Sequence, residues 1–257
     1  MLDLFSLQGK TAIVTGGSGG IGAMIAEGFV KNGVKTYITA RDQDRLDIAV
    51  ANFSKYGVCI GIRSDLSTLT GVKEFVRVIN QHETIIHILV NNAGATWGEK
   101  IDIFPEKGWD KVMDLNVKSV FFLTQHLLPF LRNAGSHEDP ARVVNIGSIN
   151  GFTHPHAHNY SYSASKAAVH HLTRQLGADL ARDEINVNGI APGVFPSKMT
   201  AHMLIDEAEA EVTSSIPRGR LGTAEDIAGT TIFLCSRASA WMTGHTLILD
   251  GGQVAVS

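Results

Sequence analysis

The sequence predicts a doubly wound α/β fold, in which helices cover both faces of one parallel sheet. Short β-branched runs alternate along the whole chain with longer segments whose apolar residues recur at helical spacing. Runs that are apolar throughout, rather than at every second residue, are typical of parallel strands buried on both faces. No repeat or linker divides the 257 residues. We therefore expect a single domain spanning residues 1–257.

Seven segments are expected to form strands. The first, TAIVT at 11–15, precedes a segment in which Ile21, Ile25 and Phe29 share one helical face. Right-handed crossovers between such units give a parallel sheet. Helices are expected behind the first and third strands and at about 107–131, 162–181 and 224–236. The expected strands are 11–15, 35–39, 58–62, 85–90, 142–146, 185–190 and 246–250.

Composition excludes several classes of protein. A net charge of −3 argues against nucleic acid or an anionic membrane as the main partner. Cys59 and Cys235 lie in apolar runs and are expected to be buried thiols, with no disulfide framework. The first ten residues lack the pattern of a signal peptide, and no apolar stretch reaches membrane-spanning length. We expect a soluble cytoplasmic protein.

Unusual residues follow the strands at one edge of the expected sheet. In a doubly wound sheet, ligands bind outside the carboxyl ends of the strands. A purely structural domain has no reason to gather such residues there. In strand order they are Gly16 to Gly22, Arg41, Asp65, Asn91 to Gly94, Ser148 and Pro192-Gly193.

The loop after the first strand has the spacing Gly16-xxx-Gly20-x-Gly22. Glycines let the backbone turn tightly and approach a pyrophosphate, while the next helix offers free N–H groups and a positive dipole end. A tight strand–helix connection with no ligand would also favour glycine. The position after the first strand favours dinucleotide binding.

Tyr162 and Lys166 are four residues apart on an expected helix, so they share a face. A free tyrosine has a pKa of about 10. A nearby ammonium favours the phenolate and would bring that pKa toward the working range of an acid–base catalyst. Ser148, which follows the preceding strand, could add a hydroxyl. The alternative is an ordinary surface pair.

Taken together, these segments resemble the short-chain dehydrogenase/reductase family, from Gly9 to Gly252. The resemblance implies a Rossmann fold with a seven-stranded sheet and hydride transfer between a nicotinamide cofactor and a carbonyl or alcohol carbon. The motifs that carry it are Thr15-Gly16-xxx-Gly20-x-Gly22, Asn91-Asn92-Ala93-Gly94, Asn116, Ser148, Tyr162-xxx-Lys166 and Pro192-Gly193.

The resemblance also implies residue roles. Tyr162 would be the general acid/base, and Ser148 would orient and polarise the substrate carbonyl. Lys166 would lower the tyrosine pKa and bind the nicotinamide ribose. Asn116 would interrupt its helix and hold a water in a proton relay to Lys166. Cofactor contacts are expected from Gly16, Ser18, Gly19, Gly20, Ile21, Gly22, Arg41, Asp65, Leu66, Asn92, Ala93, Gly94, Tyr162, Lys166, Pro192, Gly193 and Ser197.

The end of the second strand bears on cofactor choice. An acidic residue there would bind the adenosine 2′-OH and repel a 2′-phosphate. Ala40 removes that carboxylate, and the planar fork of Arg41 can pair with a phosphate. NADPH/NADP⁺ is therefore favoured over NADH, although Gly19 stands where many NADPH-using members of the family carry a basic residue. Ser197 replaces a common threonine and keeps its hydroxyl.

The substrate pocket is expected beyond the nicotinamide, with a substrate loop at about 193–222. The wording of NNAGATWG, VNIGSINGF and INVNGIAPGVFPSKMT is most similar to 3-oxoacyl reductases of rhamnolipid pathways, which implies a 3-oxoacyl thioester carried by acyl-carrier protein or CoA. Reduction of another ketone, a sugar alcohol or a steroid stays open, as do a dinucleotide-sensing regulator and a structural scaffold. The candidate pocket residues are Trp97, Asn150, His156, Phe195 and Met199.

His154, His156 and His158 alternate in the loop before Tyr162. On a strand they would share a face and could bind a metal. Pro155 breaks such pairing and favours a polar loop at the pocket mouth, so no metal is expected.

The helices at 107–131 and 162–181 carry more apolar residues than one sheet face can cover. The residues expected to form a surface shared between subunits are Phe121, Phe122, Leu127, Leu128, Leu172, Leu176 and Leu180. Members of the family commonly pair these helices across a two-fold axis and form a second contact with the last strand. The resemblance therefore implies a homotetramer, with a dimer as the alternative.

Overall fold

All seven strands join one parallel sheet in the order β3-β2-β1-β4-β5-β6-β7. The computed structural model describes residues 2–153, 158–201, 204–205 and 207–256. The order reverses between β1 and β4, as in a Rossmann fold, so the predicted fold class is confirmed. The strands are β1 (Thr11–Thr15), β2 (Lys35–Ala40), β3 (Cys59–Arg63), β4 (Ile88–Asn91), β5 (Ala141–Ile146), β6 (Ile185–Pro192) and β7 (Thr246–Leu249).

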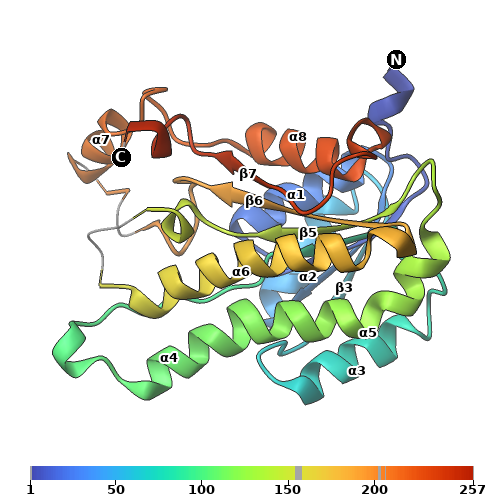
Figure 1. Ribbon diagram of the computed structural model, residues 1–257, viewed down its shortest axis with the longest axis horizontal. Coiled ribbons are helices and arrows are strands. Elements are labelled where there is room, and N and C mark those ends of the chain that lie inside the picture. The colour runs from blue at the N-terminus through green and yellow to red at the C-terminus, as the bar shows by residue number, and fades with distance from the viewer. Residues whose placement is uncertain (1, 154–157, 202–203, 206, 257) are drawn as a thin grey trace.

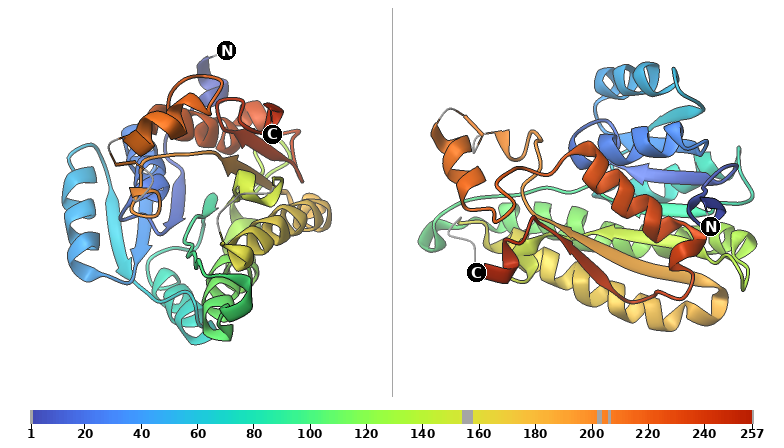
Figure 2. Two further views of the ribbon diagram at one scale, coloured as in Figure 1. Left: turned by 90° about the vertical axis from the view of Figure 1, so that its left-hand side faces the viewer. Right: turned by 90° about the horizontal axis from the view of Figure 1, so that it is seen from above.

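Helices lie on both faces of the sheet (Figures 1 and 2). One face is covered by α1 (Gly20–Lys31), α2 (Gln43–Phe53) and α8 (Ala224–Cys235), whose apolar sides form one buried cluster. The other is covered by α3 (Leu69–Ile79), α5 (Ser119–Ala134) and α6 (Tyr160–Asp179), which contribute to the second cluster. α4 (Glu106–Met113) precedes α5, and the short α7 (Glu207–Ser214) lies at the end of the sheet toward which β6 and β7 run (Figure 1).

The expected strands agree with the observed ones within a few residues. The helix expected at 107–131 is a continuous helical stretch made of α4, a π-helical turn at Asp114–Lys118, and α5. Asn116 lies in that turn, at the point where the family resemblance implies an interruption of the helix. Two helices had no counterpart among the expected elements. These are α2, which buries only three apolar residues, and α7, which lies inside the expected substrate loop.

Both cysteines are buried thiols, as expected. Burial raises the pKa of Cys59 to about 11 and that of Cys235 to about 12, so neither thiol is reactive at neutral pH. Among the helices that the structure describes, none is long and apolar enough to cross a membrane. His154 and His156 lie outside the described residues, and within the part of the chain that the structure describes no group of His, Cys, Asp and Glu side chains is suited to a metal ion.

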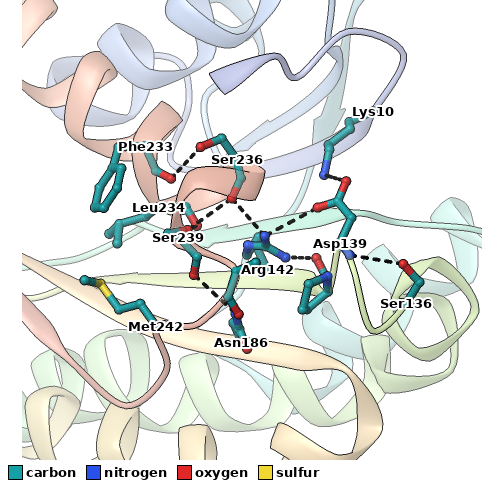
Figure 3. A network of polar contacts seen from close by, with 12 residues as sticks. Lys10, Ser136, Asp139, Arg142, Asn186, Phe233, Leu234, Ser236, Ser239 and Met242 are labelled. Carbon is teal, nitrogen blue, oxygen red and sulfur yellow. Dashed lines mark hydrogen bonds and ion pairs between the residues drawn. The ribbon is translucent and has the colours of Figure 1, made fainter. Parts of the chain in front are cut away.

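A buried arginine links the sheet to α8 at the edge opposite the glycine-rich loop (Figure 3). Arg142 on β5 is 1% exposed, donates to the carbonyl of Ser236 just after α8 at 2.8 Å, and also donates to the carbonyl of Pro140. Asp139 lies 3.4 Å from the Arg142 guanidinium and 2.7 Å from the Lys10 ammonium. The network joins the start of β1, the loop before β5 and the end of α8.

Removing this arginine should destabilise the fold. Arg142→Ala leaves buried carbonyls without a donor and should lower the free energy of unfolding by about 3 kcal/mol. Arg132→Ala is the matched control, because Arg132 forms an exposed ion pair with Asp183 at 2.6 Å and such pairs contribute less than about 1 kcal/mol. Urea unfolding of both variants measures the difference. Equal, small losses would show that the network adds no more than a surface pair.

Candidate active site

A cleft of about 300 Å³ lies outside the carboxyl ends of the central strands, where the sequence places its unusual residues. It is bounded by the loops that follow β1, β4, β5 and β6, and by the start of α6. Its lining residues include, among others, Gly16, Gly19, Gly20, Ile21, Asn92, Ala93, Gly94, Ser148, Tyr162, Lys166, Pro192, Gly193, Phe195, Ser197 and Met199.

The glycine-rich loop forms one wall of this cleft. Gly16 and Gly20 have φ of +66° and +54°, a region that other residues rarely adopt. A Cβ at Gly22 would lie 2.3 Å from the Asn92 side chain and 2.4 Å from the Gly16 carbonyl oxygen, so α1 can begin this close to the loop only with glycine there. Gly19 caps α1 without a side-chain hydrogen bond. The first amides of α1 are therefore available to an anion.

Thr15 and Asn92 hold the ends of β1 and β4 together beneath the loop. The Thr15 hydroxyl accepts from the backbone N–H groups of Asn92 and Ala93, each at 2.9 Å. The Asn92 amide donates to the Thr15 carbonyl at 2.8 Å. Asn92 therefore braces the glycine-rich loop as well as lining the cleft. The sequence places Thr15 in the glycine motif, but its role as an acceptor is seen only in the structure.

Lys166 brings a buried charge to the floor of the cleft. Its side chain is 6% exposed, and Nζ donates to the Ile146 carbonyl at the end of β5 at 2.7 Å. Burial lowers the pKa of Lys166 from 10.5 to about 8, since desolvation penalises the ammonium. The group is still mostly protonated at neutral pH, which leaves a cation with donor capacity facing the cleft.

Tyr162 lies one helical turn before Lys166, as the spacing predicts, with Nζ 5.5 Å from the centre of the phenol ring. Burial raises the pKa of Tyr162, and a hydrogen bond from Ser148 opposes part of that rise. The direction is opposite to the lowered pKa expected from the sequence. The reason is that desolvation of the phenolate outweighs the stabilising contacts in the site itself. Tyr162 is therefore a protonated phenol at neutral pH, hydrogen-bonded to the serine predicted to assist it.

Asn116, in the π-helical turn, forms hydrogen bonds to the loop after β4 and to α6. Its Oδ1 accepts from the Ala95 N–H at 2.8 Å, and its Nδ2 donates to the Ala95 carbonyl at 3.0 Å and to the Ser165 hydroxyl at 2.9 Å. Ser165 in turn donates to the Tyr162 carbonyl at 2.7 Å. Asn116 thus fixes the loop after β4 against the first turns of α6. Its predicted part in a proton relay stays a prediction.

His170 supports the loop of Ser148 and is absent from the residues singled out in the sequence. Its Nε2 accepts from the Ser148 N–H at 3.4 Å, and its ring stacks on Phe152 with centroids 4.2 Å apart. Burial, assisted by the Lys166 and Arg174 charges, lowers its pKa to about 4, so the imidazole is neutral and can accept. A Cβ at Gly147 or Gly151 would clash with the ring. The sequence shows a histidine one helical turn after Lys166. Its contacts with Gly147 and Gly151, which lie earlier in the chain, are seen only in the structure.

A second hollow, of about 400 Å³, lies at the ends of β2 and β3. It contains Arg41, which the sequence predicts to bind the adenosine 2′-phosphate, and Asp65, which it predicts to contact the cofactor. Leu66 is buried in the core beside it. Its lining residues are Arg41, Arg63, Ser64, Asp65, Gly71 and Glu74.

The candidate pocket residues separate into two groups. Phe195 and Met199 line the cleft. Trp97 and Asn150 are not among its lining residues. The Trp97 ring lies against Gly108 of α4 and within 5.9 Å of the Lys107 and Lys111 ammonium groups, and Asn150 donates its N–H to the Ser148 hydroxyl at 3.2 Å. His156 lies outside the described residues.

The sequence model of the short chain dehydrogenases matches residues 10–208. The chain belongs to the short-chain dehydrogenase family. This short-chain dehydrogenase is 46% identical over 253 residues to the rhamnolipids biosynthesis 3-oxoacyl-[acyl-carrier-protein] reductase of Pseudomonas aeruginosa, which covers 98% of this chain and 99% of the relative. It is also 35% identical over 257 residues to the gluconate 5-dehydrogenase of Gluconobacter oxydans, covering 97% and 96% of the two chains.

Solved structures agree with this placement. The RhlG/NADP active-site complex of Pseudomonas aeruginosa superposes with a TM-score of 0.96 at 45% identity, over 99% of this chain and 100% of that one. A gluconate 5-dehydrogenase from Burkholderia cenocepacia, solved with NADP and tartrate, superposes with a TM-score of 0.90 at 29% identity, over 99% and 98%. The family predicted from the motifs is confirmed.

Burying Lys166 should cost the protein stability. Its pKa is lower in the folded chain than in the unfolded one, so below pH 8 folding must bury a charge that the unfolded chain keeps in water. The free energy of unfolding of Lys166→Met should therefore exceed that of the parent by about 2 kcal/mol at pH 7, after allowing for the lost hydrogen bond to Ile146. The gap should narrow as pH rises from about 8 to 10.5, where the parent also folds with a neutral lysine.

Denaturant unfolding at pH 7 and pH 10 measures both quantities. Lys73→Met, which removes an exposed lysine on α3, serves as the control and should show neither the gain nor its pH dependence. A Lys166→Met protein that is less stable than its parent at pH 7 would contradict the account of a strained buried cation.

Proposed function

We propose that this chain is an NADPH-dependent reductase that converts a carbonyl to a secondary alcohol, with a 3-oxoacyl thioester as its substrate. One observation carries the proposal. Tyr162, its hydrogen-bond partner Ser148 and the buried Lys166 meet in one cleft with a glycine-rich loop at a helix N-terminus. A regulator that only senses a dinucleotide, or a structural scaffold, has no need for the first three residues.

The residues present fit a dinucleotide phosphate. Gly19 leaves open space beside the first amides of α1, because a Cβ built there would meet no atom within 4 Å. Ser197 covers Gly20 from the opposite side, and a Cβ at Gly20 would lie 3.1 Å from that of Ser197. The loop amides and the Ser197 hydroxyl would hold the cofactor, and Lys166 would donate to the nicotinamide ribose. When bound, NADPH supplies the hydride.

The raised pKa of Tyr162 suits the reductive direction. A carbonyl that accepts a hydride becomes an alkoxide, which needs a proton, and a phenol that is protonated at neutral pH can donate one. The Ser148 hydroxyl, held by the Asn150 N–H at 3.2 Å, would stabilise the developing negative oxygen. The Lys166 cation would stabilise the phenolate left after transfer.

The choice of a 3-oxoacyl thioester has two supports. The Pseudomonas aeruginosa relative, matched over nearly the whole of both chains, is named as a 3-oxoacyl-[acyl-carrier-protein] reductase. Beside the polar catalytic residues, the cleft has an apolar side formed by Phe195 and Met199, which would suit an acyl chain. The partner would then be acyl-carrier protein or CoA carrying that chain. Oxidation or reduction of a sugar acid is the second candidate, because other relatives are gluconate 5-dehydrogenases.

The reaction can be tested by NADPH oxidation with acetoacetyl and longer 3-oxoacyl thioesters, run beside 5-ketogluconate and repeated with NADH. We expect turnover of the thioesters with NADPH. Tyr162→Phe should lower that turnover by at least about 100-fold, since only the hydroxyl carries the proton. NADP⁺ binding by the variant, followed by calorimetry, should be retained.

Tyr160→Phe is the matched control, because Tyr160 is a second tyrosine on the same helix that does not line the cleft. It should keep near-normal turnover. If Tyr162→Phe also keeps it, the assignment of the acid is wrong. If the sugar acid is reduced and no thioester is, the substrate proposal is wrong while the reductase assignment holds.

We also propose a homotetramer. Leu127 and Leu180, which the sequence assigns to the shared surface, are buried in this chain's own core. Phe121 on α5 is nevertheless 37% exposed, and Ile248 on the edge strand β7 and the nearby Trp241 are 44% and 98% exposed. Large apolar side chains on an edge strand are a site for association with another chain.

A charged side chain on β7 should disrupt the proposed contact between subunits at this edge strand. Ile248→Lys should convert the tetramer to a dimer, as measured by light scattering at micromolar concentration. Ile48→Lys, at a 63% exposed position on α2, should leave it intact. A parent protein that is a stable, fully active monomer would refute the proposal.

A further inference from the structure

The hollow at the ends of β2 and β3 contains a second arginine beside Arg41. Arg63 is the last residue of β3 and pairs in register with Ala40, the last residue of β2. The Arg63 Nε donates a hydrogen bond to the backbone carbonyl of Arg41 at 3.0 Å. This contact holds the Arg63 guanidinium next to Arg41, the residue predicted to bind a phosphate. Both arginines are exposed and line the same hollow of about 400 Å³.

The acidic residues around this hollow already have partners. Glu74 accepts two hydrogen bonds from Arg77, at 2.8 and 2.9 Å. Asp65 accepts from the backbone and hydroxyl of Ser67, and Asp42 lies 3.2 Å from the Arg45 guanidinium. Within the described part of the chain, neither Arg41 nor Arg63 forms an ion pair. Two cations therefore line one hollow without forming an ion pair to Asp65 or Glu74, the two carboxylates that line it as well.

The glycine-rich loop does not supply such a cation. Gly19 has no side chain, and a Cβ there would meet open space. A 2′-phosphate bound by Arg41 alone would have one guanidinium for a group that carries close to two negative charges. Arg63 can supply the second, and the paired forks of two arginines suit the oxygens of one phosphate.

We infer that Arg63 is a second determinant of selectivity for NADP(H), acting with Arg41 on the adenosine 2′-phosphate. This inference rests on the proposed cofactor and extends it to a residue that neither the glycine motif nor the end of the second strand indicates. Arg63 lies far from the cleft that contains Tyr162, so it would affect binding and leave the chemical step unchanged.

Calorimetric titration of Arg63→Met with NADP⁺ and NAD⁺ tests the inference without turnover. Losing hydrogen bonds to a charged phosphate should weaken NADP⁺ binding by about 10- to 100-fold. NAD⁺, which has no 2′-phosphate, should change less than about twofold. The same ratio should appear with 2′,5′-ADP against 5′-AMP, which isolates the adenosine end.

Three further variants complete the design. Arg41→Met should lose affinity on the same scale, and Arg63→Lys should recover part of the loss because the charge is kept while the planar fork is not. Arg237→Met removes an exposed arginine at the opposite edge of the sheet and should change nothing. Circular dichroism melting checks that each variant is folded.

The outcomes separate the two proposals. If the parent prefers NADP⁺ and Arg63→Met keeps that preference, or loses NADP⁺ and NAD⁺ equally, the role of Arg63 is overturned while the cofactor stands. If the parent binds NAD⁺ as tightly as NADP⁺, the cofactor proposal and the inference fall together. A failure of every carbonyl substrate would affect only the reaction, because binding is measured independently.

Discussion

The burial of the Lys166 ammonium is the constraint on which the arrangement of the site depends. The ammonium donates to the carbonyl of Ile146, the last residue of β5. This bond fixes the register of α6, which is how far the helix is shifted along the end of β5. That register sets Tyr162 one turn earlier, beside Ser148, and His170 one turn later, beneath the same loop. Burial of the ammonium lowers the pKa of Lys166, and burial of the neighbouring phenol raises the pKa of Tyr162. One buried environment therefore disfavours the charged form of both groups.

A ladder of buried amides and hydroxyls extends this constraint into the core. Asn91 on β4 donates to Asn145 on β5 at 2.9 Å and to Thr124 on α5 at 3.2 Å. Asn145 donates to Thr173 on α6 at 2.9 Å. Both threonine hydroxyls donate to their own helices, so each can accept from an asparagine. Directional bonds of this kind allow one relative position of strands and helices, whereas apolar packing alone would tolerate several.

These contacts mark the limit of what the sequence could predict. Strands such as β1 could be predicted because an unbroken apolar run is a local signal. The Tyr162-xxx-Lys166 pair could be predicted because helical spacing is also a local signal. The contacts of His170 and Arg63 were not predicted, because each joins two residues 22 positions apart in the chain, and such pairings depend on how the elements are arranged in the fold. The lowered Tyr162 pKa was expected from one neighbour, but desolvation, a property of the whole site, has the opposite sign and is larger. Trp97 was predicted to line the pocket from its neighbours in sequence, whereas the packing of its ring against Gly108 of α4, 11 residues on, is seen only in the structure.

The two ends of the proposed cofactor site use charge in different ways. Lys166 is buried, so its charge is costly, strongly felt by its neighbours and sensitive to pH near 8. Arg41 and Arg63 are exposed, and exposed charges are screened by solvent and salt, so each is expected to contribute less to binding than a buried cation would. An exposed pair can also change without disturbing the core, since the Arg63 contact uses only a backbone carbonyl as acceptor. Substitutions at the ends of β2 and β3 could therefore change cofactor preference without disturbing the core. The positions of the catalytic residues, in contrast, are fixed by hydrogen bonds within the core.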